Sequence, residues 1–120
     1  MGKRIIVIED EALIALDIEQ AVTDAGCEVV GYGRTVKQGL ELIETKGCDG
    51  AVLDANLNGE SARPILERLK ADDLPYVVVS GYSRDQLDFL DDATILVSKP
   101  FSMNELVSSI RQHLNETDTS

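Results

Sequence analysis

Ile5-Ile6-Val7-Ile8-Glu9-Asp10 is the stretch that decides the fold, because four β-branched apolar residues run directly into two carboxylates. An apolar run without polar alternation is typical of a strand buried on both faces of a parallel sheet. Three later runs have the same form, and each ends at polar residues: Ala51-Val52-Leu53 before Asp54, Tyr76-Val77-Val78-Val79 before Ser80, and Ile95-Leu96-Val97 before Ser98 and Lys99. The sequence therefore predicts a parallel sheet whose strands end in reactive or charged side chains.

Segments with helical periodicity alternate with these strands, and a further strand is expected from Glu28 to Tyr32. The first helix should follow the acidic pair and bury a wide apolar face, formed by Leu13, Ile14, Leu16, Ile18 and Val22. Later helices are expected around Val36 to Ile43, from near Ser61, from about Asp85 to Leu90, and after Ser102, which forms a capping box with Glu105. This alternation predicts a doubly wound α/β fold in one domain, residues 1–120, with a frayed polar tail at 115–120.

Composition narrows the range of functions. The net charge of −11 argues against direct nucleic-acid binding, because phosphate backbones attract basic surfaces. No apolar stretch approaches the roughly 18 residues of a membrane span, and no signal peptide is evident, so we expect a cytoplasmic protein without membrane contact. Cys27 and Cys48 are expected to be free thiols in a reducing compartment.

The strand-end residues form a candidate site, because the carboxyl ends of parallel strands meet at one edge of the sheet, where ligands bind. Glu9, Asp10 and Asp54 would lie together there, and two such charges about 5 Å apart repel by about 3 kcal/mol at a dielectric constant of 20. A hard cation such as Mg²⁺ would offset that repulsion. Asp54 could serve as a nucleophile that accepts a phosphoryl group, with Lys99 and Ser80 contacting its oxygens.

Each of these residues also has a purely structural interpretation. Glu9 and Asp10 could favour the positive end of the following helix. Asp54 and Ser80 could be turn residues before glycine-containing loops, and Lys99 could be an exposed strand-end residue.

Taken together, Glu9-Asp10, Asp54, Ser80 and Lys99-Pro100-Phe101 closely resemble the receiver domain of two-component response regulators, of the single-domain type. The resemblance implies a flavodoxin-like sheet with strand order 2-1-3-4-5 and helices on both faces. It implies that Asp54 is the phosphoacceptor, and that Mg²⁺ is held by Asp10, Asp54, the Asn56 carbonyl and, mostly through water, Glu9. It also implies that Lys99 pairs with Asp54, that Ser80 is a switch hydroxyl, and that the Lys99–Pro100 bond is cis.

The resemblance also implies a partner and a role. A histidine kinase or histidine phosphotransfer protein would supply the phosphoryl group, and the domain would act as a signalling module, not a classical enzyme. With no output domain in the sequence, we expect the output to be contact with a downstream protein or a phosphoryl relay.

One departure from the family pattern concerns the switch. Receivers usually carry an aromatic residue three positions before the Lys, where this chain has Leu96. The segment from Pro75 to Tyr82 resembles the PFxFATGY motif of an alphaproteobacterial subgroup linked to general stress-response signalling. Tyr82, following Ser80 and Gly81, is therefore a candidate for the missing movable aromatic group, or alternatively a loop anchor.

Three alternatives stay open from the sequence. The chain could be a degenerate receiver that serves only as a docking module, which Leu96 favours. It could be a small haloacid-dehalogenase-like phosphatase, although that family expects a second Asp where this chain has Asn56. A flavodoxin-like flavin binder would need a phosphate-binding loop where this chain has Glu9-Asp10-Glu11.

Overall fold

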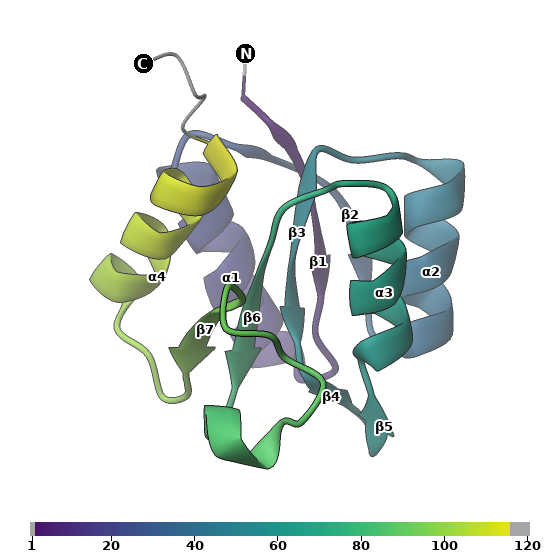
Figure 1. Ribbon diagram of the computed structural model, residues 1–120. Helices are drawn as coiled ribbons and strands as arrows, with labels where there is room; N and C mark the ends of the chain where they lie inside the picture. Colours follow the sequence, from purple (N-terminus) through teal and green to yellow (C-terminus); the bar gives the residue numbers. More distant parts are fainter. Residues whose placement is uncertain (1, 116–120) are drawn as a thin grey trace.

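The computed structural model describes residues 2–115 and contains the predicted parallel sheet (Figure 1). Five strands pair in the order β2-β1-β3-β6-β7, all in parallel, which confirms the predicted order and fold class. The strands are β1 Arg4–Ile8, β2 Glu28–Gly33, β3 Gly50–Asp54, β6 Tyr76–Ser80 and β7 Ile95–Ser98. No helix among the described residues is long and apolar enough to cross a membrane.

Helices cover both faces of the sheet (Figure 1). Helices α1 Ala12–Asp24 and α4 Met103–Ile110 lie on one face, and α2 Val36–Thr45 and α3 Arg63–Ala71 lie on the other. The inward residues form two apolar clusters, one on each side, with the central strands β1 and β3 fully buried between them beyond Arg4. The sheet is thus packed between two layers of helices, which hold the strand ends and the side chains on them in place.

Helix α4 begins at the N-cap Ser102 that the sequence predicts, although the return contact of a capping box, from the Glu105 side chain, is not among the contacts of the described residues. The Ser102 hydroxyl accepts the Glu105 N–H at 3.1 Å, and Leu106, Ile110 and Leu114 are buried. The helix continues through one wider turn, Arg111–Asn115, where the Asn115 amide donates to the Ala25 carbonyl at 2.9 Å. Asn115 is thus anchored to the end of α1, and the remainder of the predicted tail, 116–120, lies outside the described residues.

The predicted apolar face of α1 is wrong in part. Leu13 and Leu16 are 79% and 60% exposed. The buried residues are instead Ala15, Ile18, Ala21 and Val22. Small alanines at the contact let α1 lie close to the sheet and α4, and the helical period then turns Leu13 and Leu16 outward.

The predicted helix from Asp85 to Leu90 is also wrong. A single 3₁₀ turn, Arg84–Gln86, begins the connection between β6 and β7, and the rest of the connection is irregular. Arg84 stabilises this path, since its guanidinium donates to the carbonyls of Asp91 at 2.9 Å and Thr94 at 2.6 Å. The Asp91 carboxylate accepts the Thr94 hydroxyl at 2.8 Å, a local side-chain bond that competes with helix formation.

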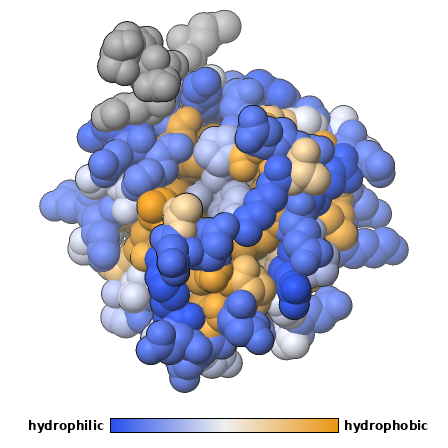
Figure 2. Space-filling model, viewed as in Figure 1, coloured by the Kyte–Doolittle hydropathy of each residue, from blue (hydrophilic) through white to orange (hydrophobic). Residues whose placement is uncertain are grey.

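Because the connection between β6 and β7 contains no full helix, it covers the neighbouring part of the sheet incompletely. Phe89, Leu90 and Leu96 are only half-buried. Figure 2 shows apolar side chains between polar ones on the face that carries the connection.

A small hairpin follows β3. Strands β4 Asn56–Leu57 and β5 Glu60–Ser61 pair in an antiparallel manner around Asn58 and Gly59, both at positive φ. Leu57 is fully buried and anchors the hairpin, whose turn then lies beside the carboxyl ends of β1 and β3.

Candidate functional site

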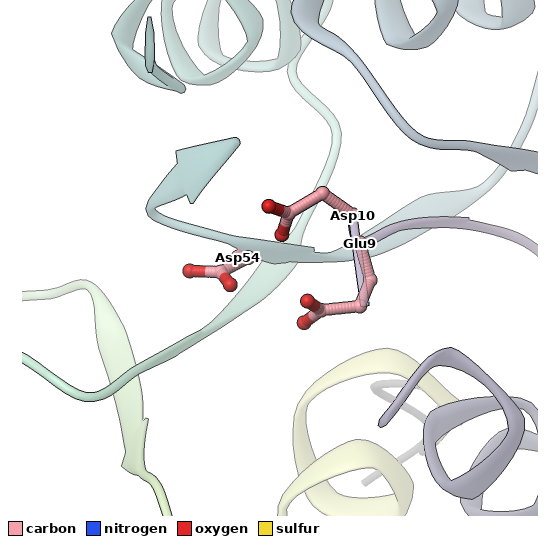
Figure 3. Close-up of side chains that lie close together, drawn as sticks. All are labelled: Glu9, Asp10 and Asp54. Carbon is pink, nitrogen blue, oxygen red and sulfur yellow. The ribbon is translucent and has the colours of Figure 1, made fainter. Parts of the chain in front are cut away.

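The carboxyl edge of the sheet brings together all the strand-end residues predicted from the sequence. Glu9 and Asp10 follow β1, Asp54 ends β3, Ser80 ends β6 and Lys99 follows β7. Carboxylate oxygens of Glu9, Asp10 and Asp54 lie within 4.8 Å of one another, and in Figure 3 their side chains point toward a common space.

Asp54 lies at the centre of the site and is only 6% exposed. Its Oδ2 accepts the Lys99 ammonium at 2.7 Å, and its Oδ1 accepts the Asn56 N–H at 3.1 Å. Both oxygens are therefore held in a fixed direction at the floor of an open pocket of about 240 Å³, lined by Asp10, Glu11, Asp54, Asn56, Gly81, Tyr82 and Lys99.

Lys99 is the cation of the site. Burial favours its neutral form, but the contacts with Asp54 and Glu9 outweigh burial and raise the pKa of the ammonium. Its Nζ also lies 3.6 Å from the exposed Glu11 carboxylate. The Lys99–Pro100 peptide bond is cis.

Glu9 is fully buried, and burial together with the Asp54 charge raises the pKa of its carboxyl to about 7. Its Oε2 accepts the Glu11 N–H at 3.1 Å. Its Oε1 lies 3.2 Å from Lys99 Nζ but makes no contact with hydrogen-bond geometry to any described residue. A buried carboxylate oxygen that lacks such a bond is costly, which suits a site completed by a cation.

Asp10 is half-buried and is held from two sides. Its Oδ2 accepts the Asn58 N–H at 3.0 Å, and its carbonyl accepts the Arg34 guanidinium at 3.1 Å. The small hairpin thus orients the Asp10 carboxylate toward Asp54.

Two of the predicted switch residues, Gly81 and Tyr82, line the pocket of Asp54. Ser80 is fully buried, and its Oγ accepts the Tyr82 N–H at 2.9 Å. Tyr82 is 49% exposed and lines both the Asp54 pocket and a neighbouring hollow of about 250 Å³ near Leu87 and Phe89. Leu96 packs, half-buried, at the edge of the apolar cluster and contributes to neither pocket lining.

Asn56 has its side chain engaged elsewhere, since its Oδ1 accepts the Gly59 N–H at 3.0 Å and closes the hairpin turn. An Asp in this place would carry the second catalytic carboxylate of a haloacid-dehalogenase-like phosphatase. Because the Asn56 side chain is bound to the hairpin turn, it is not directed toward Asp54 as that catalytic carboxylate would need to be.

Sequence reasoning missed the contribution of Tyr32, Arg34 and the Asn58 backbone. Their contacts with Glu9 and Asp10 span 23, 24 and 48 residues of sequence. No local pattern indicates such contacts, although the register of β1 against β2 could have placed Tyr32 near the acidic pair.

Comparison with known proteins identifies the family. A family model described as the response regulator receiver domain matches residues 5–111. The chain belongs to the receiver domain family. A receiver is a signalling domain, and receivers generally bind Mg²⁺ at an acidic pocket; this chain has an acidic cluster of Glu9, Asp10 and Asp54.

Individual receivers resemble this one over most of its length. The phyllosphere-induced regulator PhyR of Methylorubrum extorquens is 30% identical over 118 residues, which cover 95% of this chain and 44% of that protein. The chain spans about half the length of the first curated relatives it matches.

Two solved receivers match over nearly their full length. The PhyR receiver domain of Erythrobacter litoralis is 26% identical with a TM-score of 0.84, and the match covers 99% of this chain and 96% of that one. SdrG of Sphingomonas melonis Fr1 is 34% identical with a TM-score of 0.75, covering 91% and 93%. These likenesses support the predicted relation to the alphaproteobacterial PFxFATGY receivers.

Proposed function

We propose that this receiver accepts a phosphoryl group on Asp54 from a phosphohistidine of a histidine kinase or histidine phosphotransfer protein, in the presence of Mg²⁺. The observation that carries the proposal is the pairing of Asp54 Oδ2 with Lys99 at 2.7 Å inside a cluster of three carboxylates. A buried nucleophile beside a fixed cation suits the transfer of a group that carries negative charge.

In the proposed transfer, a carboxylate oxygen of Asp54 attacks phosphorus in line with the P–N bond of the phosphohistidine. The P–O bond forms as the P–N bond breaks, and the electron pair stays on the imidazole nitrogen, which takes up a proton. The product is an acyl phosphate on Asp54. The Asn56 N–H and Lys99 orient the two oxygens beforehand, so positioning and charge neutralisation supply the rate enhancement.

The residues at the site fit Mg²⁺. The donor set consists of oxygens from Glu9, Asp10 and Asp54, and the buried Glu9 Oε1 has no hydrogen bond within residues 2–115. Asp10, Asp54 and the Asn56 carbonyl would bind the ion directly, with Glu9 contributing mostly through water. Bound there, Mg²⁺ would neutralise the negative charge that the carboxylates and the phosphoryl group bring together.

Ser80 and Tyr82 are proposed to transmit the change. Because Ser80 Oγ accepts the Tyr82 N–H, its own hydrogen is available to donate toward a phosphoryl oxygen on Asp54. A shift of Ser80 would then move Tyr82 between the two hollows that it borders. This movement would alter the surface offered to a downstream protein, in place of the aromatic switch that Leu96 does not provide.

Intact-mass measurement with acetyl phosphate and Mg²⁺ tests the central proposal. We expect the mass to rise by one phosphoryl group, and Asp54→Asn to abolish the rise. Asp85→Asn, which removes an exposed carboxylate outside the cluster, is the matched control and should still be phosphorylated.

Other outcomes favour the rival functions. An unchanged mass at every Mg²⁺ concentration would favour a docking module. Continuous release of inorganic phosphate at high turnover would favour a phosphatase.

The switch has its own test by amide NMR. Phosphorylation should shift the resonances of the connection from Gly81 to Thr94 in the parent protein, and Tyr82→Ala should reduce those shifts. Equal shifts in parent and variant would exclude Tyr82 as the moving group.

A further inference from the structure

Residues 32–34, at the end of β2, hold the acidic pair through three contacts. The Glu9 N–H donates to the Gly33 carbonyl at 3.0 Å. The Tyr32 hydroxyl donates to the Glu9 carbonyl at 2.9 Å, and Arg34 donates to the Asp10 carbonyl at 3.1 Å. Every one of these contacts is with backbone atoms of the acidic pair, so they fix the peptide units without occupying the carboxylate oxygens.

The Tyr32 contact stands where the β ladder stops. Ile8 pairs with Gly33, and a continued parallel ladder would bring the Thr35 N–H to the Glu9 carbonyl. The chain instead leaves the sheet, with Thr35 serving as the N-cap of α2. The Tyr32 hydroxyl donates to that carbonyl in place of a backbone N–H.

The Glu9 carbonyl belongs to the peptide unit that joins the two acidic residues. Rotation of this unit would swing the Asp10 Cα and its carboxylate, because the Glu9 side is already held by β1 and Gly33. A hydrogen bond on the carbonyl restricts this rotation. The position of the Asp10 carboxylate relative to Asp54 therefore depends on Tyr32 as well as on Asn58.

We propose that Tyr32 is a positioning residue of the metal site, whose hydroxyl fixes the Glu9–Asp10 peptide unit and thereby prepares the acidic cluster for a divalent cation. The proposal rests on the Mg²⁺ site of the proposed function. Residues that orient metal ligands from outside the coordination shell influence affinity because they remove the cost of ordering those ligands.

Tyr32→Phe is the deciding variant, because it deletes the hydroxyl and keeps the ring. We expect the loss of this one neutral hydrogen bond to raise the Mg²⁺ dissociation constant by about 3- to 10-fold. Isothermal titration calorimetry with MgCl₂ measures the constant directly and needs no phosphorylation. Phosphorylation by acetyl phosphate should be slower at low Mg²⁺ and recover at saturating Mg²⁺.

Tyr76→Phe is the matched control, since Tyr76 lies at the amino end of β6, at the other end of the strand from the acidic cluster, and the change should leave the dissociation constant unchanged. A Tyr32→Phe protein with lower metal-free stability but unchanged Mg²⁺ affinity would overturn the inference and leave Tyr32 a structural role. If the parent binds Mg²⁺ and is phosphorylated on Asp54, and Tyr32→Phe binds Mg²⁺ with the same affinity as the parent, only the inference about Tyr32 fails. If the parent binds no Mg²⁺, both the inference and the proposed metal site fail.

Discussion

At the scale of single residues, Glu9 gives the site a pH dependence. Its folded-state pKa of about 7 lies above the ordinary value of 4.5, so the folded protein holds a proton that the unfolded chain releases. The contribution of Glu9 to the free energy of unfolding without metal should therefore be complete below about pH 4.5 and be lost as the pH rises through about 7, a loss of about 3 kcal/mol.

Glu9→Gln should remove most of this dependence, because the amide does not ionise. Urea unfolding in EDTA at pH 5 and pH 8 would measure it, and the variant should gain stability relative to the parent at the higher pH. Glu60→Gln, at an exposed position, serves as the control. A Glu9→Gln effect of the same size at both pH values would contradict the prediction.

A second prediction at this scale concerns the contribution of Lys99 to stability. Its side chain is 15% exposed and pairs with the buried Asp54 and Glu9, so Lys99→Met would leave a cluster of carboxylates without its cation. We expect the free energy of unfolding without metal to fall by about 2 kcal/mol, less than for a fully buried pair.

Lys70→Met provides the comparison in the same denaturation experiment. The Lys70–Asp91 pair has a similar distance, 2.8 Å, but its side chains are 45% and 52% exposed. Because solvent screens this exposed pair, its loss should destabilise the protein clearly less than the loss of the Lys99 pair. Equal losses for the two variants would show that burial does not set the strength of the Lys99 pair.

At the scale of elements, the connection between β6 and β7 is held mainly by Arg84, which bonds carbonyls seven and ten residues further along the chain. Arg84→Ala should speed amide hydrogen exchange from Ser83 to Thr94 by about 5-fold, because the lost hydrogen bonds lower the free energy of local opening by about 1 kcal/mol. Global unfolding should change little. Arg63→Ala, which removes a contact within α3, should leave exchange in the connection unaltered.

The same connection shows where prediction from sequence succeeds and fails. The buried strands were predictable because continuous apolar runs have few alternatives, and Asp54, Ser80 and Lys99 follow them directly. The helix expected from Asp85 failed because tertiary contacts of Arg84 and local bonds of Asp91 determine that path.

The acidic cluster was predictable from topology, but its supports were not. Because the strands are parallel, their carboxyl ends lie at the same end of the sheet, and the carboxylates that follow them lie together there. Contacts such as Tyr32 with Glu9 depend on strand register and on where the chain leaves the sheet, and the exposure of Leu13 depends on which face of α1 meets α4.

At the scale of the whole molecule, stability without metal should be limited by repulsion among the carboxylates. Asp10→Asn removes one charge and keeps an oxygen that can accept the Asn58 N–H. We expect the metal-free variant to be more stable than the parent by about 1–3 kcal/mol, from charges less than 5 Å apart.

The same variant should lose the stabilisation that Mg²⁺ gives the parent, because a ligand stabilises only in proportion to its binding to the folded state. Thermal unfolding with and without MgCl₂ measures both effects. A destabilised metal-free variant would contradict the idea of a strained cluster. Asp24→Asn, at an exposed position at the end of α1, is a suitable control.

The arrangement of the tyrosines has an optical consequence. The chain has three tyrosines and no tryptophan, so its tyrosine fluorescence, from Tyr32, Tyr76 and Tyr82, is not masked by tryptophan emission. Tyr32 bonds the acidic pair, and Tyr82 borders the pocket of Asp54. The domain thus carries its own fluorophores beside its charged centre, and events there can be followed without a dye.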